Sequence, residues 1–197
     1  MLGTFVDTAI SAEHGLASEA DVFMTVDDPI AVLKGAVGME FQGKEFFEDA
    51  AGKVGHPRTK IVFESLAKQE QKHIDVLAEE LRRLQGGQSW ASLTEAQVSA
   101  KAGLTLSVFQ EERMKHLVLD PNAGELEALK LGIEVEQRSI EYYRNAGARV
   151  SDPHAKEVFN WLVGQEAGHL TILSSEYEYR SNPGFYYDTM EFSLEVM

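Results

Sequence analysis

Apolar residues recur every three or four positions in two stretches of the first half of the chain, which is the spacing of amphipathic helices. The first helix begins at Asp28-Pro29, because aspartate at the N-cap and proline at the first helical position favour a helix start. It is predicted to end near Gly52. A second helix follows from about Pro57 and is stopped by Gly86-Gly87. The pattern predicts an antiparallel helical hairpin.

A second pair of helices is predicted in the other half, over about 122–148 and 153–180, with a turn at Ser151-Asp152-Pro153. Few stretches alternate apolar and polar residues as a strand would, so the predicted class is all-α. Part of the connection between the pairs, about 104–119, also reads as helix. The expected organisation is an N-terminal extension over 1–28, a four-helix bundle over 29–180 with hairpins 29–86 and 122–180 and one long crossover over 87–121, and a C-terminal tail over 181–197.

An internal repeat relates the two helix pairs with one constant offset of 96 residues. The offset covers both helices of a pair and the turn between them, so the chain is a duplicated helical hairpin. The matched residues include Leu33 and Leu129, Glu40 and Glu136, Phe47 and Tyr143, Pro57 and Pro153, Phe63 and Phe159, Leu66 and Leu162, Glu70 and Glu166, His73 and His169, and Leu77 and Leu173.

Six ionisable side chains fall on or beside the apolar stripes of the four helices. Glu70 and His73 are three residues apart and share one helix face, and the second hairpin repeats this Glu-x-x-His pattern. Charged groups on a core-facing stripe are costly unless they are paired or bound to a cation. The candidate metal-binding and catalytic residues are Glu40, Glu70, His73, Glu136, Glu166 and His169.

In each hairpin, two of these glutamates lie at the same distance along the helix axis from the turn. The glutamate of each leading helix and the glutamate of the following Glu-x-x-His are equidistant from one turn residue, Gly55 in the first hairpin and Ser151 in the second. Pairing the hairpins around a pseudo-twofold axis then brings all six side chains to mid-bundle. Four carboxylates and two imidazoles neutralise two divalent cations, with two carboxylates bridging them. The alternative interpretation of these six residues is that they are surface charges or a buried salt-bridge network. The repeat and the equal heights favour the metal site over this alternative.

Composition narrows the chemistry and the partners. The chain has no cysteine, which excludes iron–sulfur clusters, disulfides and cysteine nucleophiles, so any metal must be held by Glu, Asp and His. Oxygen-rich sites with imidazole suit iron, with manganese or zinc as alternatives. The formal net charge of −14 argues against nucleic acid and anionic membranes as partners. No apolar run or basic leader indicates a membrane span or signal peptide, so we expect a cytoplasmic protein.

These residues resemble the rubrerythrin-like branch of the ferritin-like superfamily, over about residues 29–180. The resemblance implies a ferritin-like bundle with a di-iron centre and oxidoreductase chemistry on peroxide or dioxygen, often in defence against oxidative stress. The stretches that carry it are Ala36-Val37-Gly38-Met39-Glu40 with Glu45-Phe46-Phe47, Glu70-Gln71-Lys72-His73, Ile133-Glu134-Val135-Glu136 with Glu141-Tyr142-Tyr143, and Glu166-Ala167-Gly168-His169.

The chain also departs from rubrerythrin proper. It lacks the rubredoxin domain with four cysteine ligands, so electrons must come from a separate donor. It carries Ile133 where rubrerythrin has an extra glutamate. We expect a homodimeric di-iron peroxidase or oxidase. A ferroxidase or other iron-handling protein, a bundle that metal stabilises without catalysis, and manganese catalase-like chemistry remain open.

Several further residues carry expectations. Tyr143 lies two turns after Glu136 and is expected to hydrogen-bond a ligand carboxylate, with a role as an electron source as the alternative. The stem of Lys44 is expected to run along the bundle so that its ammonium reaches water, with pairing to a carboxylate near the site as the alternative. Close approach of another helix or subunit would explain Gly164 and Gly168 inside a helix. The remaining histidines, read as surface or turn residues, are His14, His56, His116 and His154.

Overall fold

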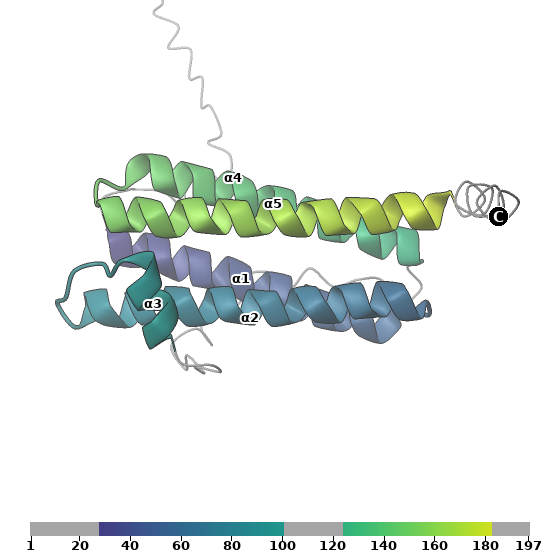
Figure 1. Ribbon diagram of the computed structural model, residues 1–197, viewed down its shortest axis with the longest axis horizontal. Helices are drawn as coiled ribbons and strands as arrows, with labels where there is room; N and C mark the ends of the chain where they lie inside the picture. Colours follow the sequence, from purple (N-terminus) through teal and green to yellow (C-terminus); the bar gives the residue numbers. More distant parts are fainter. Residues whose placement is uncertain (1–27, 101–123, 183–197) are drawn as a thin grey trace, which may run out of the picture.

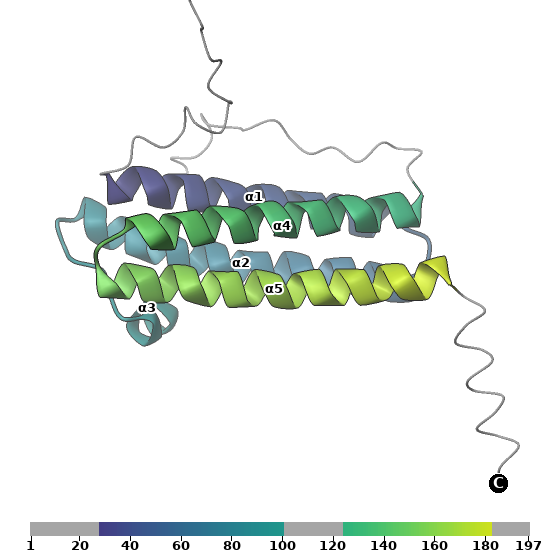
Figure 2. The same ribbon diagram turned by 90° about the horizontal axis from the view of Figure 1, so that it is seen from above.

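The computed structural model describes residues 28–100 and 124–182, which form four long helices and one short one (Figures 1 and 2). There is no strand within these two ranges, which confirms the all-α bundle. None of the described helices is long and apolar enough to cross a membrane. The helices are α1 (Pro29–Lys53), α2 (Pro57–Gln85), α3 (Leu93–Ser99), α4 (Glu125–Arg149) and α5 (Pro153–Ser181).

The helix bounds follow the repeat, since both ends of α1 and α4, and both ends of α2 and α5, differ by 96 residues. The caps explain the starts: Asp28 accepts a hydrogen bond from the Ile30 N–H, and Asp152 accepts from the N–H groups of His154 and Ala155. The first helix ends at Lys53, one residue beyond its predicted end. The predicted helix 104–119 and the predicted start of the third helix at residue 122 lie outside the described residues.

The short helix α3 is not predicted by the apolar pattern. It begins with a capping box, in which the Ser92 side chain accepts from the Glu95 N–H and the Glu95 carboxylate accepts from the Ser92 N–H. A buried cluster of Val76, Ala91 and Ala96 fixes α3 and its preceding loop against α2. Seven residues are too few for a periodic signal, so only the cap marked this element in the sequence.

The bundle pairs α1 with α2 and α4 with α5 as antiparallel hairpins, and the hairpins meet with α1 beside α4 and α2 beside α5 (Figure 2). Its apolar core is divided into two clusters. Leu33, Leu77 and Phe159 belong to one cluster, and Phe47 and Leu129 belong to the other. A layer of polar side chains lies between them, at the height predicted for the six candidate residues.

Candidate metal centre

The structure brings together all six candidate residues. Each is at most 3% exposed, and together they come from the four long helices. Their ligand-type atoms form two overlapping groups, and within each group the atoms all lie within 4.8 Å of one another. One group consists of Glu40, Glu70, His73 and Glu166, and the other of Glu70, Glu136, Glu166 and His169.

Glu70 and Glu166 belong to both groups, so these two carboxylates are placed to bridge two cations. Each hairpin therefore contributes one shared carboxylate from its Glu-x-x-His helix. The remaining residues divide evenly, with Glu40 and His73 in one group and Glu136 and His169 in the other. The sequence predicted two bridging carboxylates without saying which of the four they are, and the overlap of the two groups singles out Glu70 and Glu166 as the candidates.

Both imidazoles point a ring nitrogen into the carboxylate cluster. The His73 Nδ1 atom lies 3.1 Å from a Glu166 oxygen and 3.4 Å from a Glu70 oxygen. The His169 Nδ1 atom lies 2.9 Å from Glu166 and 3.0 Å from Glu70. The two rings stack with centroids 5.4 Å apart. The shared carboxylates thus lie between the two histidines.

Hydrogen bonds do not satisfy this cluster. Buried atoms with no hydrogen bond of acceptable geometry include Glu70 Oε1, Glu136 Oε1, both Glu166 carboxylate oxygens and both His169 ring nitrogens. Orphaned buried polar atoms are rare and costly, and these are oxygen and imidazole donors of the kind that iron, manganese and zinc accept. The donor set therefore fits a pair of divalent cations better than a salt-bridge network.

Glu40 and Glu136 each belong to only one of the two groups and are called the private carboxylates below. The pKa values of both are raised. Burial, followed by the charges of Glu70 and Glu166, raises the pKa of Glu40 well above its ordinary value. Burial is also the largest cause of the raised pKa of Glu136. For the shared carboxylates, burial also acts to raise the pKa, but close polar contacts outweigh it and the pKa of each is lowered. These contacts are with Glu40 and the histidines for Glu70, and with the histidines for Glu166.

The histidines are shifted toward the charged form. Burial alone would lower the pKa of His169, but its contacts with Glu136, Glu166 and Glu70 raise it to about 11. The pKa of His73 is raised for the same reason, chiefly by the Glu40 charge. The directions of these pKa shifts favour imidazolium at His73 and His169 and the protonated form of Glu40 and Glu136, a combination in which the metal-free cluster is neutral. These four protons balance the charge of the four carboxylates, and two divalent cations would supply the same charge of +4 in their place.

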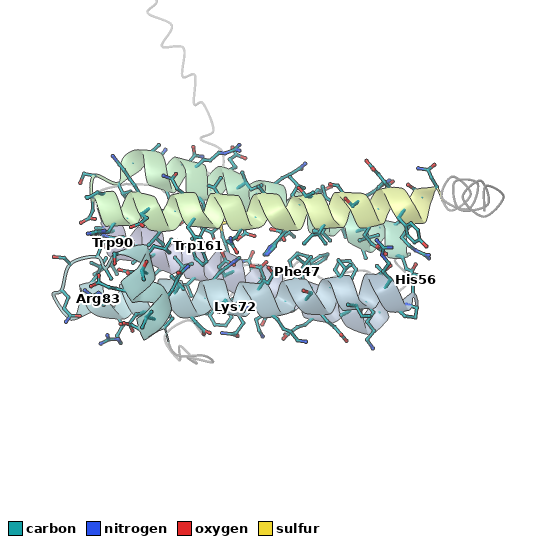
Figure 3. The ribbon with its side chains drawn as sticks, in the orientation of Figure 1. Phe47, His56, Lys72, Arg83, Trp90 and Trp161 are labelled. Carbon is teal, nitrogen blue, oxygen red and sulfur yellow. The ribbon has the colours of Figure 1, made fainter. Side chains whose placement is uncertain are left out.

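Aromatic side chains from the second hairpin contact the Glu40–His73 half of the cluster. The buried Tyr143 hydroxyl donates a hydrogen bond to Glu40 Oε1, so the prediction of a hydrogen bond to a ligand-type carboxylate is confirmed, and the partner lies in the other hairpin. The ring of Trp161 meets the His73 ring edge to face, with centroids 5.3 Å apart. In Figure 3, Trp161 and Phe47 are both labelled in the space between the two hairpins.

The other singled-out residues lie away from the centre. The Lys44 ammonium pairs with the Glu48 carboxylate on the same helix at 2.9 Å, and the Lys44 side chain is 23% exposed. Ile133 is half-buried against the apolar cluster around Phe47, so no carboxylate occupies that position. His56 occupies the N-cap position of α2 without a side-chain capping hydrogen bond, and His154 is exposed at the start of α5. His14 and His116 lie outside the described residues.

The prediction that another helix approaches Gly164 and Gly168 is wrong within the described part of the chain, while approach of another subunit stays a prediction. A Cβ atom added to either glycine would have nothing within 4 Å, and both residues are exposed. No helix approaches them there, because α5 turns this face outward while its stripe with Glu166 and His169 faces the core.

The sequence reading missed the buried carboxylates outside the centre, of which Glu80 and Glu176 are the most deeply buried. Glu80 and Glu176 are at most 1% exposed and are repeat equivalents, each seven residues after a centre histidine. The offset of 96 residues and their place on the apolar stripe could have found them. The contact of Trp161 with His73 had no such signal, because the equivalent residue in the first hairpin is the exposed Ser65.

Comparisons with known proteins agree with this architecture. The family model described as rubrerythrin matches residues 31–177. Among solved structures, a hypothetical protein from Pyrococcus furiosus is similar in fold, with a TM-score of 0.56 and 21% identity over 77% of this chain and 89% of that chain. No curated protein matches the chain.

Proposed function

The chain belongs to the rubrerythrin family and has its ferritin-like bundle, and from this premise we propose that it is a di-iron oxidoreductase that reduces peroxide or dioxygen. The observation that carries the proposal is the pair of overlapping four-residue groups that share Glu70 and Glu166. A cluster built to stabilise the bundle would not need two carboxylates common to two sets of ligand-type atoms.

The six residues have distinct roles in this proposal. Glu70 and Glu166 would be shared by the two iron ions, with Glu40 and His73 as the further ligands of one ion and Glu136 and His169 as those of the other. Two ferrous ions would supply the two electrons that, with two protons, convert hydrogen peroxide to two water molecules. Buried carboxylates with raised pKa values, Glu40 and Glu136, are the groups in this chain suited to exchange protons near the reacting oxygen atoms.

The proposed partners are a separate electron donor and a second copy of the chain. Because the chain contains no cysteine for a rubredoxin-type centre, a separate one-electron donor must restore the ferrous state after each turnover. We propose a homodimer as the working assembly and a cytoplasmic role in defence against oxidative stress. Neither nucleic acid nor membrane is a proposed partner, given the net charge of −14.

Anaerobic titration with ferrous iron tests the site, and addition of peroxide then tests the chemistry. We expect about two iron ions per chain and rapid oxidation of both, with one peroxide consumed per pair. Failure to bind iron would refute the proposal. Binding without oxidation by peroxide or dioxygen would leave a metal-stabilised bundle as the function.

Iron handling is the alternative enzyme function, since a carboxylate centre of this kind can also oxidise ferrous iron for storage. It predicts continued oxidation far beyond two iron ions per chain and a cage-sized assembly on size-exclusion chromatography. A dimer that stops after two would exclude storage. Manganese in place of iron would show in elemental analysis of the protein from its native source.

A further inference from the structure

The two halves of the centre differ in what holds their private carboxylates. Glu40 Oε1 accepts the hydrogen bond of the Tyr143 hydroxyl, and its other oxygen lies 3.3 Å from the His73 Nδ1 atom. Glu136 Oε1 lies 3.4 Å from His169 Nδ1 and accepts no hydrogen bond. One private carboxylate is therefore held by a phenol, and the other is not.

The repeat shows that this difference amounts to one hydroxyl group. Tyr143 stacks on Phe159 with ring centroids 6.3 Å apart and an interplanar angle of 21°. Its equivalent, Phe47, stacks on Phe63 with centroids 6.0 Å apart and an angle of 23°. All four rings are fully buried. Because both rings are held in the same way, a hydroxyl on Phe47 would face Glu136 as the Tyr143 hydroxyl faces Glu40.

The histidines of the two halves are also packed differently. Trp161 meets the His73 ring edge to face at 5.3 Å. The equivalent residue beside the His169 half is Ser65, which is exposed and brings no ring. The Glu40–His73 half is thus held at both of its private residues, while among residues 28–100 and 124–182 no phenol or tryptophan makes the equivalent contacts with Glu136 and His169.

The difference has a chemical consequence. A carboxylate with one oxygen engaged by a phenol binds a cation through its remaining oxygen, and moving it breaks a buried, charge-assisted hydrogen bond. A carboxylate without such a partner can change between one-oxygen and two-oxygen binding. That change opens or closes a coordination position on its cation, which is what an incoming ligand requires.

We propose that the two metal positions are unequal, such that the position of Glu40 and His73 stays fixed and the position of Glu136 and His169 opens to bind the oxygen substrate. The inference rests on the proposed function, because it names where peroxide or dioxygen binds in that centre. Tyr143 and Phe47 act through the carboxylates as positioning residues.

The test uses the full chain loaded with cobalt(II), which is coloured and is not oxidised by dissolved azide. Azide serves as the probe for an open coordination position. The variants are Phe47→Tyr, which adds the missing hydroxyl, and Tyr143→Phe, which removes the existing one. Tyr142→Phe is the matched control, because the Tyr142 hydroxyl donates to the Val32 carbonyl oxygen, outside the centre.

We expect the wild-type chain to take up two cobalt ions and to bind one azide. Phe47→Tyr should weaken azide binding about tenfold, which is the effect of one hydrogen bond to a charged group, without changing the cobalt count. Tyr143→Phe should keep that azide and admit a second, and Tyr142→Phe should match the wild type. The visible spectrum of cobalt(II) reports each change in coordination, which loss of packing alone would not produce.

The outcomes separate this inference from the proposed function. Fewer than two cobalt ions in the wild type would contradict the two-metal centre itself. Two cobalt ions with azide binding weakened by Tyr143→Phe, or unchanged in Phe47→Tyr, would overturn the inequality and leave the centre intact. If Phe47→Tyr does not fold, the azide count of Tyr143→Phe decides, since a single azide there refutes the inference.

Discussion

The two hairpins agree at the centre of the bundle and differ toward its ends. Glu80 on α2 and its equivalent Glu176 on α5 are both fully buried, yet they have different partners. Glu176 Oε1 accepts a hydrogen bond from the Thr59 hydroxyl at 2.8 Å, and Glu176 Oε2 forms an ion pair with Arg58 Nε at 2.8 Å. Glu80 accepts the Ala91 N–H at 3.2 Å, and its other oxygen has no hydrogen-bond partner.

This difference shows what the duplication preserved. The six central residues and the helix bounds repeat, as the proposed pair of cations would require, because it would take equal donors from both hairpins. The partner of Glu80 lies in the loop before α3. The partners of Glu176 are Arg58 and Thr59 in the first turn of α2, where the repeat changes the residues to His154 and Ala155 in α5. Each variant below either breaks the central symmetry or measures the difference at the ends.

The largest effect is expected from the shared carboxylates. Glu166→Ala removes a donor from both groups, whereas Glu136→Ala removes a donor from one. We expect Glu166→Ala to weaken both cation positions by more than about 100-fold, beyond the effect of losing an outer partner. Glu136→Ala should leave one cation bound. Calorimetric cobalt titration of the two variants would measure the counts, and equal counts would contradict the assignment of the shared residues.

Metal binding should release protons equally from the two hairpins. Each contributes one imidazolium and one protonated private carboxylate, with the pKa of His169 at about 11. Cations must displace these protons, so affinity rises with pH by up to about tenfold per unit for each proton displaced. Titration calorimetry in buffers of different ionisation enthalpy would count them. We expect up to four protons per pair of cations, and none would refute the charge balance.

Removing the carboxylate of Glu176, which has both a hydrogen bond and an ion pair, should destabilise the fold. Glu176→Ala leaves the buried Thr59 hydroxyl without its acceptor and removes the partner of Arg58. The expected cost is about 1–3 kcal/mol of unfolding free energy. Thermal unfolding of the metal-free protein would show a melting point lower by several degrees. Glu176→Gln keeps an acceptor for Thr59 and should lose less, so an equal loss would argue against this hydrogen bond.

The carboxyl group of Glu80, near the other end of the bundle, should make the free energy of unfolding fall as pH rises. Burial raises the pKa of Glu80 to about 7, above its unfolded value. The protonated form is therefore favoured in the folded state, and its contribution is present at low pH and lost as pH rises through about 7. Glu80→Gln should raise the melting point at pH 8 and change it little at pH 5. A variant less stable than wild type at pH 8 would contradict this sign.

The smallest effect concerns the outward face of α5. Gly164 and Gly168 have open space around an added Cβ, while their equivalents in α2 are the exposed Lys68 and Lys72. Gly168→Ala should stabilise the helix by up to about 1 kcal/mol. Gly35→Ala is the matched control and should destabilise, because its Cβ would clash with the Tyr142 hydroxyl. A destabilised Gly168→Ala would indicate that a second chain covers this face.

The sequence by itself determined the hairpins and the residues of the centre. Helical periodicity fixes which face of a helix is buried, and the offset of 96 residues fixes equal heights in two hairpins. Together they sufficed to predict that Glu40, Glu70 and His73 converge with their three equivalents. The physical reason is that position along a helix and direction around it are both set by local backbone geometry.

Only the tertiary structure decided how the hairpins are set against each other. That placement makes Glu70 and Glu166 the shared carboxylates and directs the Tyr143 hydroxyl to Glu40 in the other hairpin. It also gives Glu80 and Glu176 their unequal partners. Periodicity carries no information on these contacts, because they depend on the rotation of one hairpin relative to the other, which the packing of the whole core sets.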